Sequence, residues 1–214
     1  MDVKEFTAAY RAAFGELPEL PLLFRFTDSP MRPVEKVGGC FFKALAEARR
    51  GLPVSLNAGN IGCGGGKFYT VFSPMPEFVP QFVSLKERYK RTPEMVLEFI
   101  AALDLRPAPK AWLEFVRADV AETFDNNAAD AVASPFGSGC SSVVAQAVQE
   151  NRNGGRRCFL GLFDPSVRPW VEPDVLSFVV PMSRFREMCG MMRASCLFDT
   201  HAWSKVRERI NNDN

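Results

Sequence analysis

The hydrophobic positions of the chain follow two periods, one typical of helices and one typical of short buried strands. Apolar side chains recur at helical spacing in six segments, namely residues 2–14, 40–50, 92–103, 141–149, 183–192 and 200–210. Short apolar runs bounded by Gly, Pro or Asp predict strands at residues 22–26, 53–56, 112–116, 158–163 and 175–180. Because short strands alternate with helices, the pattern predicts an α+β fold in which helices pack on a mixed β-sheet.

Local signals mark several helix ends and loops. Asp2 is placed to cap the first helix and Gly15 to end it. Thr92 followed by Pro93 is a typical helix start, since a capping hydroxyl precedes a proline at the first helical position. Residues 72–89 carry three prolines among aromatic side chains, which predicts an extended lid or connection.

One local pattern occurs twice in the chain, a hundred residues apart. A turn of small residues, one cysteine and an amphipathic helical stretch surround Cys40 and again Cys140, and each copy is followed by a short apolar run. The strand at 112–116 is interpreted as the counterpart of the strand at 22–26. A duplicated unit predicts two half-domains packed about a pseudo-twofold axis, with the two cysteines in equivalent places.

This duplication sets the expected domain organisation. The chain is predicted to form a single domain over residues 1–214, because its length suits one domain with a sizeable core. The two repeat halves are expected at residues 17–105 and 110–192, and a C-terminal helix at 200–210 follows them. Arg106-Pro107-Ala108-Pro109 marks the hinge between the halves.

Composition excludes some classes of partner. The chain has 26 Lys and Arg against 25 Asp and Glu, so it offers no electrostatic support for a nucleic-acid partner. No apolar run approaches the roughly 18 residues that span a bilayer, and the N-terminus lacks the features of a signal peptide. We therefore expect a cytoplasmic protein with no membrane partner. Its six cysteines should be reduced thiols or ligands.

The segment 57–67 has the most unusual local composition, since its six central residues include Cys63 and four glycines. Such conformational freedom is costly on folding, so it usually serves a backbone that needs positive φ or a close approach. The segment resembles a phosphate-binding loop ending at Lys67. That motif would need a glycine at Ile61 and a hydroxyl at Phe68, and both are missing, which argues against a nucleoside triphosphatase.

The two repeat cysteines suggest where a ligand binds. Cys40 and Cys140 each begin a predicted helix, where the helix dipole and free backbone N–H groups would stabilise a thiolate or an anion. Arg168 follows a predicted strand and could hold an anionic group. The sequence therefore predicts a site for a small anionic molecule between the repeats. Its residues are Cys40, Cys63, Gly64, Gly65, Lys67, Cys140, Asp164 and Arg168.

Two other functions remain open at this point. In one, the protein is a cysteine-ligated metal or iron–sulfur protein or redox enzyme, although no Cys-x-x-Cys pair exists to support it. Its ligands would be Cys40, Cys63, Cys140 and Cys158. In the other, the protein is a cofactor-free interaction module whose cysteines only pack. The sequence assigns no catalytic residues, oligomeric state or reaction.

The remaining thiols and the single histidine are expected to be structural. Cys189 and Cys196 are seven residues apart among methionines, which favours a Met-rich core helix over a metal site. His201 follows Thr200 and is expected on the surface of the first turn of the last helix.

Several of these motifs, in their order and spacing, resemble a known family. They are Gly38-Gly39-Cys40 with a following Gly-Leu-Pro-Val, Cys63-Gly-Gly-Gly, Ser138-Gly139-Cys140, and the turn that ends in Arg168. Over roughly residues 22–188 the chain is similar to domain-of-unknown-function family 169, a bacterial and archaeal group. The resemblance implies the fold and the cysteine geometry, and it implies no activity. Members tend to carry another cysteine before the arginine, and residues 164–167 lack it here.

Overall fold

The computed structural model of the chain describes residues 2–14, 19–35, 37–38, 42–121, 131–133, 141–161, 177–192, 194 and 200–212. The helices are α1 (Val3–Phe14), α2 (Phe42–Arg49), α3 (Gly64–Tyr69), α4 (Val79–Gln81), the π-helix η1 (Phe82–Lys86), α5 (Pro93–Ala102), α6 (Ser141–Arg152), α7 (Met182–Met192) and α8 (His201–Asn212). The strands are β1 (Leu22–Thr27), β2 (Val54–Leu56), β3 (Trp112–Arg117), β4 (Ala131–Ala133), β5 (Phe159–Gly161) and β6 (Ser177–Pro181).

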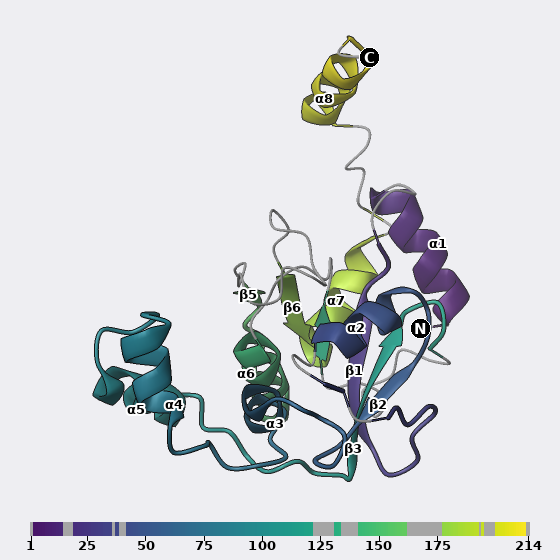
Figure 1. Cartoon of the computed structure of the whole chain (residues 1–214). Helices are drawn as coiled ribbons and strands as arrows, with labels where there is room; N and C mark the ends of the chain where they lie inside the picture. The colour runs from purple at the N-terminus through teal and green to yellow at the C-terminus, as the bar shows by residue number, and fades with distance from the viewer. Residues whose placement is uncertain are drawn as a thin grey trace.

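The strands form one sheet in the order β2-β3-β1-β4-β6-β5, with helices around it (Figure 1). The predicted α+β class is confirmed. The prediction of a mixed sheet is wrong, because all five strand pairs among the described residues are antiparallel. Helix α2 does connect two parallel strands, β1 and β2, but β3 lies between them. In the same way α6 connects the parallel strands β4 and β5, and β6 lies between them.

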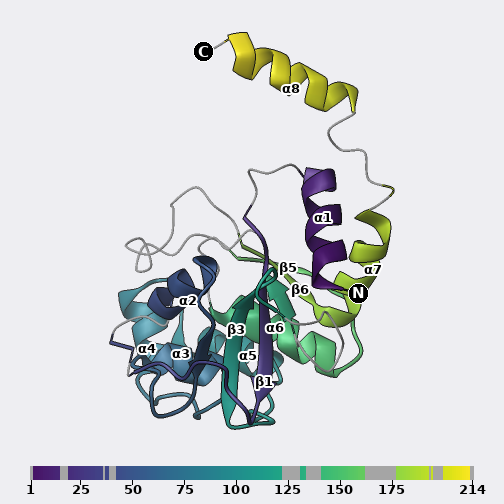
Figure 2. The ribbon, with the colours of Figure 1, turned by 90° about the vertical axis from the view of Figure 1, so that its right-hand side faces the viewer.

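The two faces of the sheet bury different sets of side chains. Alternate residues of β1 point to opposite faces, as the period of a strand requires. One face packs against α2 and α6 through a core that includes Leu22, Phe24, Phe26, Leu45, Ala48, Val54, Leu56, Leu113, Phe115, Ala147 and Val148. The other face packs against α1 and α7 through Phe6, Tyr10, Ala13, Leu23, Val180, Met182, Phe185, Cys189 and Met192. Figure 2 shows α1 and α7 side by side at one end of the sheet.

The helix ends with local capping signals are confirmed. The amide of Lys4 donates to Asp2 Oδ1 at 2.9 Å where α1 begins. Thr92 caps α5 by accepting the amide of Met95 on its hydroxyl, and Pro93 is the first residue of that helix. Gly15, the residue expected to end α1, lies outside the described residues.

A buried carboxylate ties the sheet to the loop after β1. Glu114 of β3 has 0% relative exposure and forms an ion pair with Arg25 on the neighbouring strand. Its other oxygen accepts the amide of Met31 at 2.7 Å and the hydroxyl of Ser55 at 2.8 Å. Glu114 acts only as an acceptor in these bonds, as an ionised carboxylate must.

The extended connection predicted at residues 72–89 is wrong, because this stretch contains α4 and η1. These two elements and α5 form a helical hairpin, which we call the arm, and it stands apart from the sheet (Figure 1). The prolines do not prevent the helix because Pro80 lies in its first turn, where no backbone N–H is required. The hydroxyl of Ser84 bonds back to the carbonyl of Pro80 at 2.6 Å.

The C-terminal helix predicted at 200–210 is confirmed as α8. Its first turn is capped by Thr200, whose hydroxyl accepts the amide of Trp203 at 3.2 Å. In both ribbon views α8 lies away from the sheet (Figures 1 and 2). Among the helices that the structure describes, none has the length and apolar character needed to cross a membrane.

Candidate functional site

Cys63 lies at the start of α3, inside the segment that was predicted to be a glycine loop. Its Sγ accepts the amide of Gly66 at 3.2 Å, so the thiol caps this short helix. Gly64, Gly65 and Lys67 are all residues of the helix. Four of the predicted site residues therefore lie in this short helix or at its cap, with Lys67 in the last turn, and the Cys63 thiol is half-buried.

A turn at residues 57–60 positions the segment that leads to Cys63. The side chain of Asn60 is buried and donates to the carbonyls of Val34 and Ser55, at 3.0 and 3.2 Å. These bonds hold residues 33–35 and 37–38 alongside residues 55–62.

The two aligned segments are closest at Val37. Its amide donates to the carbonyl of Asn60 at 2.7 Å, and Val37 and Ile61 form a parallel bridge. A Cβ atom added at Gly62 would lie 2.0 Å from the Val37 carbonyl oxygen, so only glycine fits this approach. The chain segments that lead toward Cys40 and Cys63 thus run side by side as far as Gly38.

The structure does not describe the other residues of the predicted ligand site. Cys40, Cys140, Asp164 and Arg168 lie outside the described residues. Cys158 is exposed just before β5. Across the described ranges, no group of three or more His, Cys, Asp or Glu side chains could hold a metal ion.

Two expectations for structural residues are confirmed. Cys189 of α7 packs in the core against Phe185 and Met192, as expected for a Met-rich core helix. Burial raises the pKa of the Cys189 thiol to about 12. His201 is exposed in the first turn of α8. Cys196 lies outside the described residues.

These environments predict a clear order of thiol reactivity, because the thiolate is the reactive form. With a pKa of about 12, roughly one Cys189 in ten thousand is ionised at pH 8. We expect a maleimide or aromatic disulfide reagent to modify Cys63 and Cys158 at least about 100-fold faster than Cys189 in the native protein. Peptide mapping by mass spectrometry measures each rate, with Cys63→Ser as the control for assignment. Equal labelling of Cys189 and Cys158 would contradict the burial.

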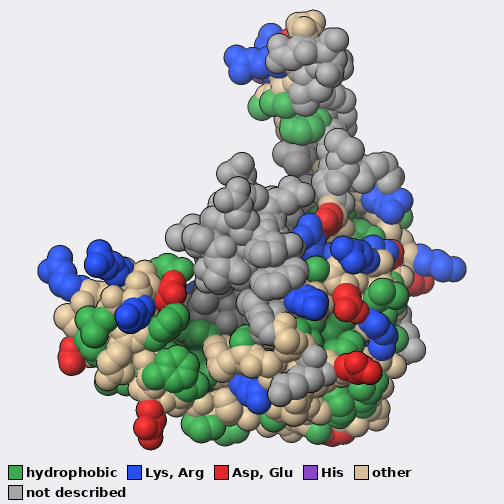
Figure 3. Space-filling model, viewed as in Figure 1, with side chains coloured by type: hydrophobic (Ala, Val, Ile, Leu, Met, Phe, Trp, Pro, Cys, Tyr) green, Lys and Arg blue, Asp and Glu red, His purple; other side chains and the backbone are tan. Residues whose placement is uncertain are grey.

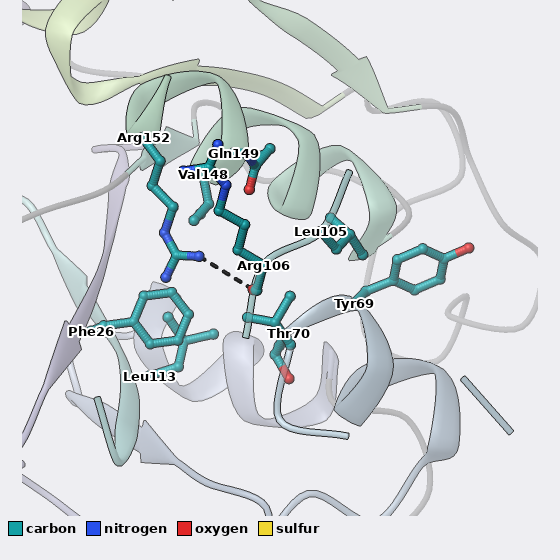
Figure 4. Close-up of a pocket in the computed structure, with 10 residues that line it drawn as sticks. Phe26, Tyr69, Thr70, Leu105, Arg106, Leu113, Val148, Gln149 and Arg152 are labelled. Atoms are coloured by element: carbon teal, nitrogen blue, oxygen red, sulfur yellow. Dashed lines mark hydrogen bonds between the residues drawn. The ribbon is translucent and has the colours of Figure 1, made fainter. Parts of the chain in front are cut away.

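A small pocket lies beyond the other end of α3, next to the sheet and α6 (Figure 4). It has room for about one water molecule. Its lining combines apolar side chains with a few polar ones, and the described residues that line it include no Asp or Glu. The lining residues are Phe26, Tyr69, Thr70, Val71, Leu105, Arg106, Leu113, Val148, Gln149 and Arg152.

Two arginines, Arg106 and Arg152, make the lining of this pocket positively charged. Arg152 donates from Nη1 to the carbonyls of Arg106 and Pro107, at 3.3 Å each. Its guanidinium carbon lies 5.4 Å from the ring centroid of Phe26, a cation–π arrangement. Figure 4 shows the Arg106 side chain running along α6, on the same side of the pocket as Arg152. The pocket therefore gathers two permanent positive charges.

The backbone of Val71 is strained where it lines this pocket. Val71 follows α3 with φ 61°, a left-handed conformation that β-branched residues rarely adopt. The amide of Val71 donates to the carbonyl of Phe68, and the amide of Phe72 donates to the carbonyl of Lys67. This is the Schellman pattern that ends many helices, and glycine is the usual residue at the position that Val71 occupies. Strain of this kind concentrates at functional sites.

Val71 also lines an adjacent open hollow. This hollow has a volume of about 520 Å³ and carries one lysine, Lys110. The carbonyl of Val71 accepts the amide of Ala108 at 3.1 Å, which joins the end of α3 to the segment before β3. The pocket and the hollow thus share one strained wall.

Sequence reasoning missed both arginines and the valine. Arg106 was interpreted only as part of a hinge, and Arg152 falls just beyond the predicted end of its helix. The two arginines are 46 residues apart, so their contact depends on the tertiary fold. No local motif in the sequence signals it.

A comparison with known families finds one match, which covers part of the chain. Residues 115–190 match the family model DUF169, described as "Uncharacterised ArCR". No curated protein and no solved structure matches the chain. The matched residues run from the middle of β3 into α7 and include α6, whose Val148, Gln149 and Arg152 line the pocket. This match confirms the resemblance found in the sequence, and it covers residues 115–190 of the chain.

Proposed function

We propose that the protein binds a small anionic molecule at the mouth of the pocket that contains Arg106 and Arg152, since the pocket itself has room for about one water molecule. The observation that carries this proposal is the placement of two guanidinium groups in one pocket whose described lining holds no carboxylate. Guanidinium groups are planar, always charged and suited to paired hydrogen bonds with carboxylate or phosphate oxygens. Arg152 is held against Phe26 and two carbonyls, so little ordering remains to be done on binding.

We further propose that the pocket lies between two pseudo-symmetric repeats. The strand order supports this, because it reads the same outward from the centre: β1 and β4 inside, β3 and β6 next, β2 and β5 at the edges. In each proposed unit a helix, α2 or α6, follows the central strand and leads to the edge strand. The twofold axis would pass between β1 and β4, which pair antiparallel.

This scheme changes the predicted repeat boundaries. The counterpart of β1 becomes β4, and β3 becomes the last strand of the first unit, equivalent to β6. The proposed units therefore span residues 22–117 and 131–181. The pocket draws on both, since β1, β3 and α3 belong to the first unit and α6 to the second. This agrees with the expectation of a site between the repeats.

The cysteine turn remains a proposed second wall of the same site. Helix α3 has six residues and is therefore about 9 Å long, with Cys63 at one end and the pocket at the other. A ligand longer than a phosphate group could contact both ends. Under this proposal Lys67, on α3 itself, adds a third positive charge near the path between them.

Binding of simple anions tests the function directly. We expect inorganic phosphate, pyrophosphate or citrate to raise the melting temperature of the full chain, and calorimetry to give a measurable Kd. Arg106→Gln should weaken that binding by about 10- to 100-fold, because a charge-assisted hydrogen bond is lost. Arg106 is exposed, so its substitution should leave the fold intact.

A matched control separates this site from general charge. Arg50→Gln removes an exposed arginine that does not line the pocket, and it should bind each anion as the unchanged chain does. Equal affinity in Arg106→Gln and Arg50→Gln would refute the pocket, as would the failure of all three anions to bind.

A further inference from the structure

The arm carries an exposed apolar stripe that the proposed ligand site does not use. Its four side chains follow one another at intervals of four, three and four residues, from the N-cap of α4 through η1 into the turn that follows. They are Phe78, Phe82, Leu85 and Tyr89, with relative exposures of 60, 44, 62 and 56%. The rings of Phe78 and Phe82 contact edge to face at 6.2 Å, so the stripe is continuous there. Figure 3 shows hydrophobic side chains on the surface of the arm.

The arm exposes apolar side chains that a helix packed against its own core would bury. The side that packs within the arm buries Pro80, the polar Ser84 and Val96 of α5, while the aromatic side faces outward. Met95 and Leu97 of α5 are exposed as well. A contiguous apolar patch of this kind on a soluble surface marks an interaction site.

Charges are separated along the arm. The end of the arm from Lys86, the last residue of η1, to the start of α5 carries four basic residues, Lys86, Arg88, Lys90 and Arg91, with Glu87 and Glu94 beside them. The opposite end, where the chain enters and leaves the hairpin, carries Glu77 and Asp104. The turn end is therefore net positive and the entry end net negative.

We propose that this stripe is the contact surface for a second copy of the same chain, packed antiparallel about a twofold axis. The spacing of the stripe reads the same from both ends, so Phe78 would face Tyr89 of the other copy and Phe82 would face its Leu85. Antiparallel packing also sets the basic turn end of each copy against the acidic entry end of the other. Such an interface is self-complementary, as twofold symmetry requires.

Charge separates this partner from the alternatives. Parallel packing would place the two basic turn ends together. An anionic membrane is disfavoured because residues 77–104 carry four basic side chains and five acidic ones, so the arm has no net positive charge to attract it. In the antiparallel pair the two basic turn ends lie at opposite ends of the interface.

Sedimentation equilibrium on the full chain from about 1 to 300 μM is the test, because this range detects a dimer with a micromolar Kd. We expect a reversible monomer–dimer equilibrium, and Leu85→Glu should raise the dimer Kd at least 10-fold. Leu52→Glu is the matched control, because Leu52 is 47% exposed and lies outside the arm. Its Kd should not change. A circular dichroism melt confirms that both variants are folded.

Charge reversal then tests the orientation. Glu77→Lys and Arg91→Glu should each weaken the dimer, and the double variant should return its Kd to within about twofold of the original chain. The proposal is overturned if the chain is monomeric throughout, or if Leu85→Glu dimerises as well as Leu52→Glu. It is equally overturned if the monomer cosediments with phosphatidylserine vesicles in a manner that Leu85→Glu abolishes, which would assign the stripe to a membrane.

Discussion

Glu114→Gln is expected to lower the free energy of unfolding by about 3–5 kcal/mol, because it breaks a buried ion pair and leaves Arg25 without its counter-charge. The native carboxylate accepts hydrogen bonds from three groups: the Arg25 guanidinium, the amide of Met31 and the hydroxyl of Ser55. A glutamine amide must turn its NH₂ group toward one of these donors, so at least one buried bond is lost. Urea unfolding followed by circular dichroism measures the change.

A double variant shows whether the loss comes from the pair itself. Replacing both partners, as in Glu114→Leu with Arg25→Leu, removes the buried charge along with its partner. We expect the double variant to recover a large part of the stability that Glu114→Gln loses. Hydrogen exchange at Met31 should speed up in both variants, since this amide donates to Glu114. A loss below about 1 kcal/mol in Glu114→Gln would contradict the assigned network.

The sequence correctly predicts the parts of the fold that depend on interactions between residues close together in the chain. Asp2 and Thr92 cap their helices through neighbours two or three residues away, and both helix starts are correct. The strand at 22–26 and the C-terminal helix are correct for the same reason, because apolar periodicity and turn residues are local signals.

The parts that the sequence does not predict depend on contacts between distant segments. Strand β3 enters the sheet between β1 and β2, and nothing in their own residues specifies this order. Three consecutive glycines have poor helix propensity, yet α3 forms with Cys63 as its cap and with Gly66 buried. In the arm, Pro80 suggested extended chain, although its place in a first helical turn is favourable.

The candidate site divides in the same way. The unusual composition around Cys63 identified one end of α3, because glycine clusters and a single thiol are visible in the sequence. The pocket at the other end depends on Arg152 reaching the carbonyls of Arg106 and Pro107 across the fold. The strained φ of Val71 is likewise a property of tertiary structure, since valine gives no local sign of it.

Gly62→Ala is the second variant with a large expected effect. The added Cβ would lie 2.0 Å from the carbonyl oxygen of Val37, a backbone atom that cannot rotate away. The two segments must separate, which strains the bond from the Val37 amide to Asn60 and the burial of Ile61. We expect a loss of about 3 kcal/mol, the upper range for overpacking, measured by urea unfolding.

Gly65→Ala is the matched control, three residues further along the same glycine cluster. An added Cβ there meets nothing within 4 Å, and alanine favours a helix over glycine. This variant should therefore gain about 0.5–1 kcal/mol. If the aligned segments also set the position of Cys63, Gly62→Ala should change the labelling rate of that thiol while Gly65→Ala leaves it unchanged. Equal stability in the two glycine variants would show that the close approach at Gly62 does not hold the segments together.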